Sequence, residues 1–491
     1  MYESTRGNYS DQTGMQAISL GMVPTGGLFV PKDKPKIDWE ELKSLTYPQL
    51  AKRILQLYLP DFPEEVLDQA ASIYNDQVFD SDNPAPLVKV GKMGILELWH
   101  GPTSAFKDMA LQVLPYLLGE SIKALSGTEK VLILVATSGD TGKAALEGFK
   151  NVTGTEIMVF YPESGVSVVQ EQQMTSTDGV NTRVVPVYGN FDQCQSAVKE
   201  IFANQSLRTK FENQHIAFSS ANSINWGRLL PQIVYYVWAY SQAVEAGSVV
   251  SGQPMNVVVP TGNFGNILAA YYAKEMGVPI KDLICASNEN NVLTDFFENG
   301  VYDRNRSFYL TSSPSMDILI SSNFERFLYD ISGRDTEKIL QWFSELQEKG
   351  KFTVDPETLA KARHYVKAGW AGEEEVLEVI QNTYQEHSYV LDPHTAVAVK
   401  VYQDYLKKTG DSTYTIIAST ASPFKFARTV LEGIDPSQVT ENEWDNLARL
   451  SELTGWGIPE GLQGLENKPV YGLEKTTPED IPELIQKVYL R

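Results

Sequence analysis

The sequence predicts a doubly wound α/β fold with a mostly parallel sheet, and two observations support this class. Short apolar runs, typical of strands buried on both faces, recur at 131–136, 156–161, 183–187, 256–259, 283–286 and 414–418. Helix-patterned segments lie between them, notably at 191–203, 226–246 and 266–276. Continuous apolar strands that alternate with helices are typical of parallel sheets covered on both faces.

The length of the chain predicts more than one domain, because 491 residues exceed what a single core usually holds. We expect an N-terminal domain at 1–92, with helical patterning at 39–57 and 63–74. A smaller α/β domain for cofactor and substrate is expected at 93–235, and a larger α/β domain at 236–491. The polar, charge-rich stretch at about 290–385 is expected to be a helical insertion, and the sequence does not assign it a role.

Composition and charge narrow the function classes. Apolar and charged fractions of 42% and 21% are those of an ordinary globular protein. A formal charge of −21 argues against nucleic acid or an anionic membrane as a partner. An anionic substrate would therefore need a local positive site. The sequence does not fix the oligomeric state, and a monomer or a homodimer is expected.

Other features point to a cytoplasmic protein without a transition metal. The first residues lack a secretory signal, and no uncharged apolar window approaches the roughly 18 residues of a membrane span. The two cysteines, Cys194 and Cys285, fit a reducing compartment, with a single disulfide as the alternative. The five histidines show no metal-ligand spacing, so no metal site is expected.

Lys107 is the first candidate catalytic residue. It lies where a polar turn gives way to a helix-forming run, with Phe106 and Met109 as apolar neighbours. Burial and the positive end of a helix dipole both disfavour an ammonium group. A lysine with a neutral amine can form a Schiff base. The alternative, an exposed lysine on an amphipathic helix, stays open at this point.

A loop with the sequence Thr-Ser-Gly-Asp-Thr-Gly-Lys, at 137–143, follows an expected strand. Its small hydroxyls, two glycines and the following helix start provide donors for an anion. It is not a Walker A loop, because Thr137 stands where the first glycine belongs and Ala144 replaces the Ser or Thr that would hold magnesium. We predict an anion site here rather than a nucleotide site.

Two further loops combine small polar residues with a helix start. Residues 260–266 (Pro-Thr-Gly-Asn-Phe-Gly-Asn) would hold one phosphate monoester, or would form a simple strand–helix turn. Residues 222–228 (Asn-Ser-Ile-Asn-Trp-Gly-Arg) offer Arg228 for a second phosphate or carboxylate. The alternative for this loop is N-capping by Asn225 with Arg228 exposed.

The last expected strand ends in Ser-Thr-Ala-Ser-Pro-Phe-Lys-Phe, at 419–426. A hydroxyl at this position can hydrogen-bond a ring nitrogen that stays largely unprotonated. Residues 392–396 (Asp-Pro-His-Thr-Ala) are expected to cap a helix. A Schiff-base lysine, phosphate sites and a hydroxyl for a ring together describe a pyridoxal phosphate enzyme that acts on a small anionic amino acid.

The same segments resemble threonine synthases of the longer form, which carries an extra N-terminal domain. The matching stretches occur in the family's order and span nearly the whole chain: 27–31, 100–112, 136–142, 222–228, 262–266 and 392–396. The lysine motif and the Ser-Gly-Asp-Thr-Gly loop are the specific ones. The chain departs from the family pattern at Ser422 and Phe424, where a histidine and an alanine are usual.

The resemblance implies a type II pyridoxal phosphate fold like that of the tryptophan synthase β chain, with two doubly wound, mostly parallel sheets and an N-terminal domain. It implies that Lys107 holds the cofactor and acts as the base, and that Thr420 faces the pyridine nitrogen. The implied ligands of the cofactor phosphate are Gly262, Asn263, Phe264, Gly265 and Asn266. The implied ligands of the substrate are Ser138, Gly139, Asp140 and Thr141 for its carboxylate, and Ser223, Asn225 and Arg228 for its phosphate.

The implied reaction converts O-phospho-L-homoserine and water to L-threonine and phosphate. The nearest alternative is a phospho-lyase on the same scaffold, which releases phosphate and forms a 2-oxo acid. A β-replacing enzyme is disfavoured, because a substrate without a distal phosphate has no use for Arg228. A non-catalytic pyridoxal phosphate carrier and a nucleotide-binding protein are the remaining alternatives.

Overall fold

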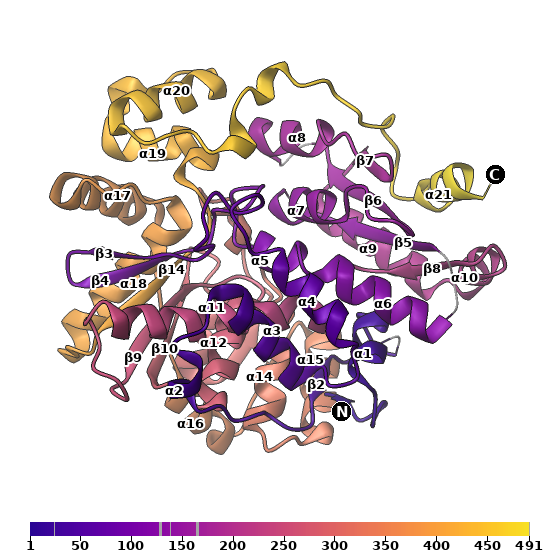
Figure 1. Ribbon diagram of the computed structural model, residues 1–491, viewed down its shortest axis with the longest axis horizontal. Coiled ribbons are helices and arrows are strands. Elements are labelled where there is room, and N and C mark those ends of the chain that lie inside the picture. The colour runs from indigo at the N-terminus through magenta and orange to yellow at the C-terminus, as the bar shows by residue number, and fades with distance from the viewer. Residues whose placement is uncertain (24, 127–129, 138, 164–165, 491) are drawn as a thin grey trace.

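Two sheets form the frame of the protein (Figure 1). The computed structural model describes residues 1–490 except 24, 127–129, 138 and 164–165. The smaller sheet has the order β7 (Thr182–Val187), β6 (Thr155–Pro162), β5 (Lys130–Ala136) and β8 (Ile216–Ser219), all parallel. The predicted strands at 131–136, 156–161 and 183–187 are therefore confirmed as neighbours, and β8 is a strand that the sequence did not reveal.

The larger sheet has six strands and also draws on distant parts of the chain. Its order is β13 (Val366–Trp370), β10 (Ile280–Ser287), β9 (Met255–Pro260), β14 (Thr415–Ser419), β4 (Met93–Glu97) and β3 (Leu87–Val90). Only β3 runs antiparallel to its neighbour.

The sheet pairing corrects the sequence-based division of the chain in two places. The strand β4 follows residue 92, but it pairs with β14 of the larger sheet instead of joining the smaller one. The insertion at about 290–385 is not purely helical, because it supplies the edge strand β13. The domain limits at 92 and 235 otherwise remain a prediction.

Both sheets are covered on both faces, as the doubly wound prediction requires. In the larger sheet, Val257 and Val259 pack toward α11 (Trp226–Glu245) and α12 (Gly265–Met276). Val258 between them belongs to the opposite core, with α17 (Glu373–His387) and α18 (Pro393–Thr409). In the smaller sheet, Ile133 faces α6 (Leu114–Ser126) and α7 (Asp140–Phe149), while Leu134 faces α9 (Phe191–Ala203) and α10 (Gln205–Glu212).

The remaining segments wrap these sheets. The N-terminal part contains β1 (Tyr2–Ser4), α1 (Gly14–Leu20), β2 (Phe29–Pro31), α2 (Trp39–Leu42), α3 (Tyr47–Tyr58) and α4 (Glu64–Ser72). The insertion contains α13 (Val292–Asn299), β11 (Val301–Asp303), the short turn η1 (Pro314–Met316), α14 (Phe324–Ile331), α15 (Thr336–Lys349), β12 (Lys351–Thr353) and α16 (Pro356–Tyr365). The end of the chain contains η2 (Pro423–Phe426), α19 (Ala427–Ile434), η3 (Pro436–Gln438), α20 (Glu443–Thr454), η4 (Glu460–Leu462), η5 (Leu465–Asn467) and α21 (Ile481–Tyr489).

A single helical turn, α5 (Asp108–Leu111), lies between the two sheets in Figure 1 and contacts both α11 and α7. The helix α8 (Val168–Thr175) packs against α7 and against the segment near η5. Both cysteines, Cys194 and Cys285, are buried and unpaired. Among the described residues, no helix is long and apolar enough to cross a membrane, and no group of His, Cys, Asp and Glu forms a metal site.

Candidate active site

Lys107 is buried at the start of α5, between loops from both sheets. Its Nζ lies 3.3 Å from Oδ2 of Asp140 and 3.3 Å from Oγ of Ser315. The ring of Phe106 lies beside the amine, with 4.9 Å between Nζ and the ring centroid. The exposed-lysine alternative is therefore wrong.

The surroundings of Lys107 favour a neutral amine. Burial lowers the pKa of Lys107, because the charged form loses its hydration. The carboxylate of Asp140 opposes this shift, while the positive charges of Lys425 and Arg228 add to it. A lysine with a lowered pKa can act as a nucleophile and as a base near neutral pH. The effect of Arg228 on the pKa of Lys107 also indicates that these two side chains lie near each other.

Asp140 is the first residue of α7 and the electrostatic centre of the site. Its Oδ1 accepts hydrogen bonds from Lys425 at 2.6 Å and from Gln170 at 2.9 Å. Burial raises the pKa of Asp140, but the ammonium groups of Lys425 and Lys107 outweigh burial and hold the pKa well below its usual range. The side chain is therefore an anion already surrounded by donors, and it cannot itself attract a carboxylate.

The other residues predicted for a substrate carboxylate belong to the same loop. Gly139 has a φ of 144°, which favours glycine, and a Cβ there would lie 2.6 Å from the side chain of Gln170. Its N–H donates to Oγ1 of Thr137 at 3.0 Å. Thr141 is half-buried in the first turn of α7. Ser138, also predicted here, lies outside the described residues.

The glycine turn at 262–266 precedes α12, as predicted. Phe264 adopts a left-handed φ of 61°, and its ring packs against Phe324 and Phe327, with centroids 5.0 and 5.4 Å away. This anchoring fixes the turn before the helix that begins at Gly265. Helix N-termini bind phosphate through free backbone N–H groups, and twelve-residue α12 presents such an end.

The remaining residues of this turn contact the insertion and α11. A Cβ on Gly262 would lie 2.6 Å from the carbonyl oxygen of Ser315, so only glycine fits there. The carbonyl of Asn263 accepts a hydrogen bond from the N–H of Asn323 at 3.0 Å. Asn266 accepts a hydrogen bond from the hydroxyl of Tyr236, while its buried Nδ2 has no partner among the described residues. An unsatisfied buried donor in a helix first turn fits an anionic ligand.

Thr420 lies beside the loop that carries Lys107. Its carbonyl accepts a hydrogen bond from the N–H of Phe106 at 2.9 Å, and Ser422 donates to the carbonyl of Ser104 at 3.0 Å. These two bonds hold the segments as a short antiparallel bridge. Thr420 is only 6% exposed. The structure thus brings the backbone of Thr420 next to the segment that carries Lys107.

Arg228 is buried in the first turn of α11 and has no carboxylate partner in the described part of the chain. One Nη donates to the carbonyl of Ala221 at 2.8 Å, while Nε is buried and has no partner among the residues that the structure describes. Burial lowers the pKa of Arg228 to about 10. An isolated buried cation is costly unless a ligand pairs with it, so this site fits an anion. The alternative of an exposed Arg228 is wrong.

Asn225 and Ser223 have mainly local contacts. Oδ1 of Asn225 accepts from the N–H of Gly227 at 2.9 Å, which confirms the alternative of an N-cap. Its Nδ2 donates to the carbonyl of Ile18 at 3.1 Å and ties α11 to the N-terminal domain. The hydroxyl of Ser223 donates to Asn222 at 3.2 Å. Their predicted contact with a substrate phosphate remains a prediction.

Three models of protein families match this chain. The model for pyridoxal-phosphate dependent enzymes matches residues 78–420, and models for the threonine synthase N terminus and C-terminal region match 1–72 and 395–469. Threonine synthase of Saccharomyces cerevisiae is 38% identical over 463 residues, which cover 88% of each chain. The chain belongs to the threonine synthase family of pyridoxal-phosphate-dependent enzymes.

Solved structures and other relatives of the family agree. A PLP-bound threonine synthase from Brucella melitensis has a TM-score of 0.87 at 32% identity, and the match covers 99% of this chain and 98% of that one. Human Threonine synthase-like 1 is 40% identical over 88% of this chain, but the chain spans only 59% of that relative. The predicted family, the type II fold with its N-terminal domain and the cofactor class are confirmed.

Four side chains in this threonine synthase-family site were not predicted from the sequence. They are Gln170, Ser315, His394 and Lys425. Lys425 and His394 stand in the sequence motifs at 419–426 and 392–396, but neither motif assigned these two side chains to the site. Ser315 lies in the polar insertion, which has no distinctive motif. The motif around His394 has the pattern of a helix cap, so it does not single out the ring of His394. Asp392 does cap α18, through the N–H groups of His394 and Thr395.

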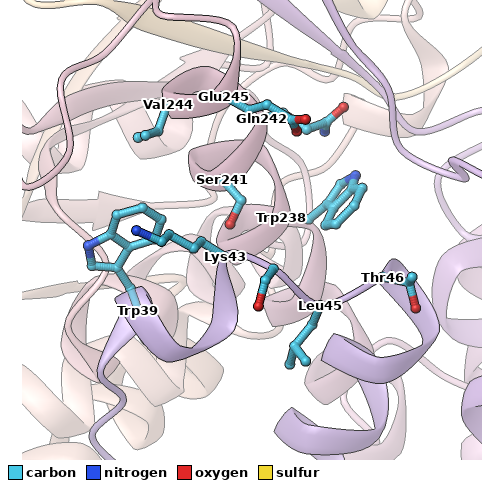
Figure 2. A pocket seen from close by; sticks show the side chains of 10 residues that line it. Trp39, Lys43, Leu45, Thr46, Trp238, Ser241, Gln242, Val244 and Glu245 are labelled. Carbon is cyan, nitrogen blue, oxygen red and sulfur yellow. The ribbon is translucent and has the colours of Figure 1, made fainter.

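A surface pocket of about 440 Å³ lies elsewhere, between the α2–α3 connection and the second half of α11 (Figure 2). Trp39 and Trp238 line it from opposite sides in this view, and Lys43 and Glu245 also line it. None of the predicted site residues lines it. It is therefore separate from the chemistry at Lys107.

Proposed function

We propose that this chain converts O-phospho-L-homoserine and water to L-threonine and phosphate, with pyridoxal phosphate bound at Lys107. The observation that carries the proposal is that one site contains two buried basic side chains, Lys107 and Arg228. Lys107 has a lowered pKa, and Arg228 is a buried cation that has no carboxylate partner among the described residues. The first suits covalent attachment of an aldehyde, and the second suits a phosphate-bearing substrate.

The donor set fits the proposed cofactor. The cofactor phosphate would occupy the turn at 262–266, where, within the described part of the chain, the Nδ2 of Asn266 lacks a partner and the N-terminus of α12 has no side-chain cap. Thr420 would offer its hydroxyl to the pyridine nitrogen. When bound, pyridoxal phosphate supplies a sink for the electron pair that remains after a proton leaves Cα of the substrate.

The substrate would be held at its two ends. Arg228 would bind the substrate phosphate, and the loop at 139–141 with the α7 N-terminus would bind the α-carboxylate through backbone N–H groups and the hydroxyl of Thr141. The two anionic ends offset the positive charges of Arg228, Lys107 and Lys425. This local field would capture an anion despite a net charge of −21.

Lys107 would then move protons. Once the substrate amine has displaced it, its neutral amine removes the proton from Cα. Loss of a Cβ proton allows the phosphate to leave from Cγ, and Arg228 stabilises the charge that develops on it. Protonation at Cγ and addition of water at Cβ give threonine.

The phospho-lyase alternative would use every one of these contacts, because the two reactions differ only in whether water adds at Cβ. Relatives named Threonine synthase-like 1 and relatives named threonine synthase are similarly close, at 40% and 36–38% identity. Incubation with O-phospho-L-homoserine followed by amino-acid chromatography distinguishes the two. We expect threonine in equal amount to the phosphate released, and 2-oxobutyrate without threonine would contradict the proposal. A cytoplasmic monomer or homodimer without nucleic-acid partners completes this proposal.

A further inference from the structure

Ser315 reaches the proposed reaction centre from the insertion. Lys107 donates a hydrogen bond to the Ser315 hydroxyl at 3.3 Å, and that hydroxyl donates to Oδ2 of Asp140 at 3.4 Å. The hydroxyl therefore accepts from the amine while its own proton points at a carboxylate. This arrangement fixes the direction in which the amine presents its hydrogens and its lone pair.

The backbone of Ser315 is held by a buried pair of residues from α18. Its N–H donates to Nε2 of His394 at 3.2 Å, and Nδ1 of His394 lies 2.8 Å from Oδ1 of Asp392. Since Nε2 accepts, the proton of the imidazole belongs on Nδ1, where it is donated to Asp392. His394 is 2% exposed, and its ring packs against Phe426 at 4.9 Å.

Side-chain hydrogen bonds from residues that follow β10 hold the rest of the loop that carries Ser315. Nδ2 of Asn288 donates to Oδ1 of Asp317 at 2.8 Å and to Oγ of Ser313 at 3.0 Å. Asn290 donates to the same oxygen of Asp317 at 3.0 Å. Asn288 and Asn290 follow β10 directly, so the sheet itself positions the loop. Buried, satisfied networks of this kind specify one arrangement.

Ser315 also adjoins the phosphate turn. Its carbonyl oxygen is the atom that a Cβ on Gly262 would meet at 2.6 Å. One residue thus contacts both the amine that would attach the cofactor and the turn that would hold the cofactor phosphate. Among the described residues of the insertion, Ser315 alone forms a hydrogen bond with Lys107.

We propose that Ser315 is a catalytic residue that orients the amine of Lys107 for proton transfer, and that His394 and Asp392 are positioning residues for Ser315. The proposal rests on the proposed function, because it assigns the proton transfer to Lys107. It gives the insertion a role in the reaction, which the sequence did not assign.

The test measures the protonation of the Lys107 amine directly, in the full chain stripped of cofactor. Cyanate carbamylates only a neutral amine, so the rate at Lys107 against pH, followed by peptide mass spectrometry, reports its protonation. The charged groups that face this amine are Asp140 of α7, Lys425 of η2 and Arg228 of α11, with His394 of α18 behind Ser315. All of them remain in the variants at position 315.

In Ser315→Ala the ammonium loses an acceptor, so the pH midpoint of carbamylation should fall by about 0.5–1 unit. In the reconstituted enzyme, kcat should fall about tenfold or more with a smaller change in KM. Ser315→Thr keeps a hydroxyl and should restore most of both. Ser312→Ala is the matched control, because its hydroxyl lies in the same loop and has no hydrogen-bond partner in the described part of the chain. An unchanged midpoint or an unchanged kcat in Ser315→Ala would overturn the proposal.

The positioning role has its own pair of variants. His394→Leu removes the acceptor for the Ser315 N–H and should lower the same midpoint, whereas His394→Gln keeps an acceptor and should restore it in part. Equal midpoints for both variants and the unaltered chain would overturn this role. Carbamylation does not depend on which product the enzyme forms. If the chain makes no threonine but the carbamylation midpoint still shifts in Ser315→Ala, only the proposed function is contradicted.

Discussion

The ammonium of Lys425 lies 2.6 Å from Oδ1 of Asp140, and both side chains are almost completely buried. Oδ2 of the same carboxylate faces Lys107 at 3.3 Å. One buried anion therefore holds two lysines, one as a permanent partner and one as the proposed reactive amine. This explains how an acidic residue can stand in a loop predicted to bind a carboxylate.

Replacing Lys425 with Met should destabilise the fold, since Asp140 would keep a buried charge with only Lys107 to balance it. Breaking a buried pair in this way typically costs about 3–5 kcal/mol of unfolding free energy. Urea denaturation, followed by tryptophan fluorescence, measures the change. The double variant Lys425→Met with Asp140→Asn should recover part of the loss. Lys361→Met, which removes an exposed partner of Glu357, is the control and should change little.

Lys107→Ala should abolish both turnover and the visible absorbance of the bound cofactor, because the other lysine that contacts Asp140, Lys425, is already held in a buried ion pair with that carboxylate at 2.6 Å. Borohydride treatment of the unaltered protein followed by peptide mapping should find the reduced cofactor on Lys107. The exposed Lys89 provides a control, and Lys89→Ala should keep both properties. Full absorbance in Lys107→Ala would contradict the assignment.

Much of the frame could be predicted, because the strands and helices are local patterns. Apolar runs such as 131–136 and 256–259 are buried on both faces, and such strands have a plain signature. The place of β4 in the larger sheet could not be predicted, for a physical reason. Its partner β14 is more than 300 residues away, and strand composition does not specify a partner.

The candidate site was predictable where one segment provides both a turn and a helix start, as at Lys107 and in the turn at 262–266. It was not predictable where the side chain reaches the site from a distant element. Ser315 lies 208 positions from Lys107, in a polar loop without a distinctive motif. His394 looks in sequence like part of a helix cap, and only the fold shows that its ring contacts Ser315.

Gly262→Ala should weaken cofactor binding, because the new methyl group would meet the carbonyl of Ser315 at 2.6 Å. That oxygen belongs to backbone, so relief requires the turn or the loop to shift. We expect the Kd for pyridoxal phosphate to rise about tenfold, equivalent to roughly 1.4 kcal/mol. Titration of the stripped protein with cofactor measures this. Gly119→Ala, in an α6 position open to solvent, should leave the Kd unchanged.

Arg228→Lys should raise KM for O-phospho-L-homoserine about 10-fold to 100-fold, because lysine cannot make the planar pair of hydrogen bonds that arginine makes to phosphate. Competitive inhibition by inorganic phosphate should weaken in parallel. Equal inhibition in the variant and the unaltered enzyme would place the phosphate site elsewhere. Arg428→Lys is the control, since that arginine is half-exposed and pairs with Glu432.

Because of Asp108, the free energy of unfolding should fall as the pH rises from mildly acidic to neutral. Burial raises its pKa to about 6, and the hydrogen bonds from Thr103 offset burial only in part. In the unfolded chain an aspartate titrates near about 3.9. The folded state thus binds this proton more tightly, so the contribution is complete below about pH 4 and is lost as pH rises through about 6. The loss corresponds to about 3 kcal/mol.

Asp108→Asn removes this titration while keeping the size of the side chain. The unfolding free energy of the variant should therefore rise relative to that of the unaltered protein between about pH 4 and pH 7, by up to about 3 kcal/mol. Urea denaturation at a series of pH values gives the difference. If the amide fits less well against Thr103, the difference in unfolding free energy shifts by the same amount at every pH. The slope of that difference against pH therefore still reports the titration of Asp108. Two parallel curves would mean that Asp108 is ionised in the folded protein throughout this range, and that the donors of Thr103 outweigh its burial.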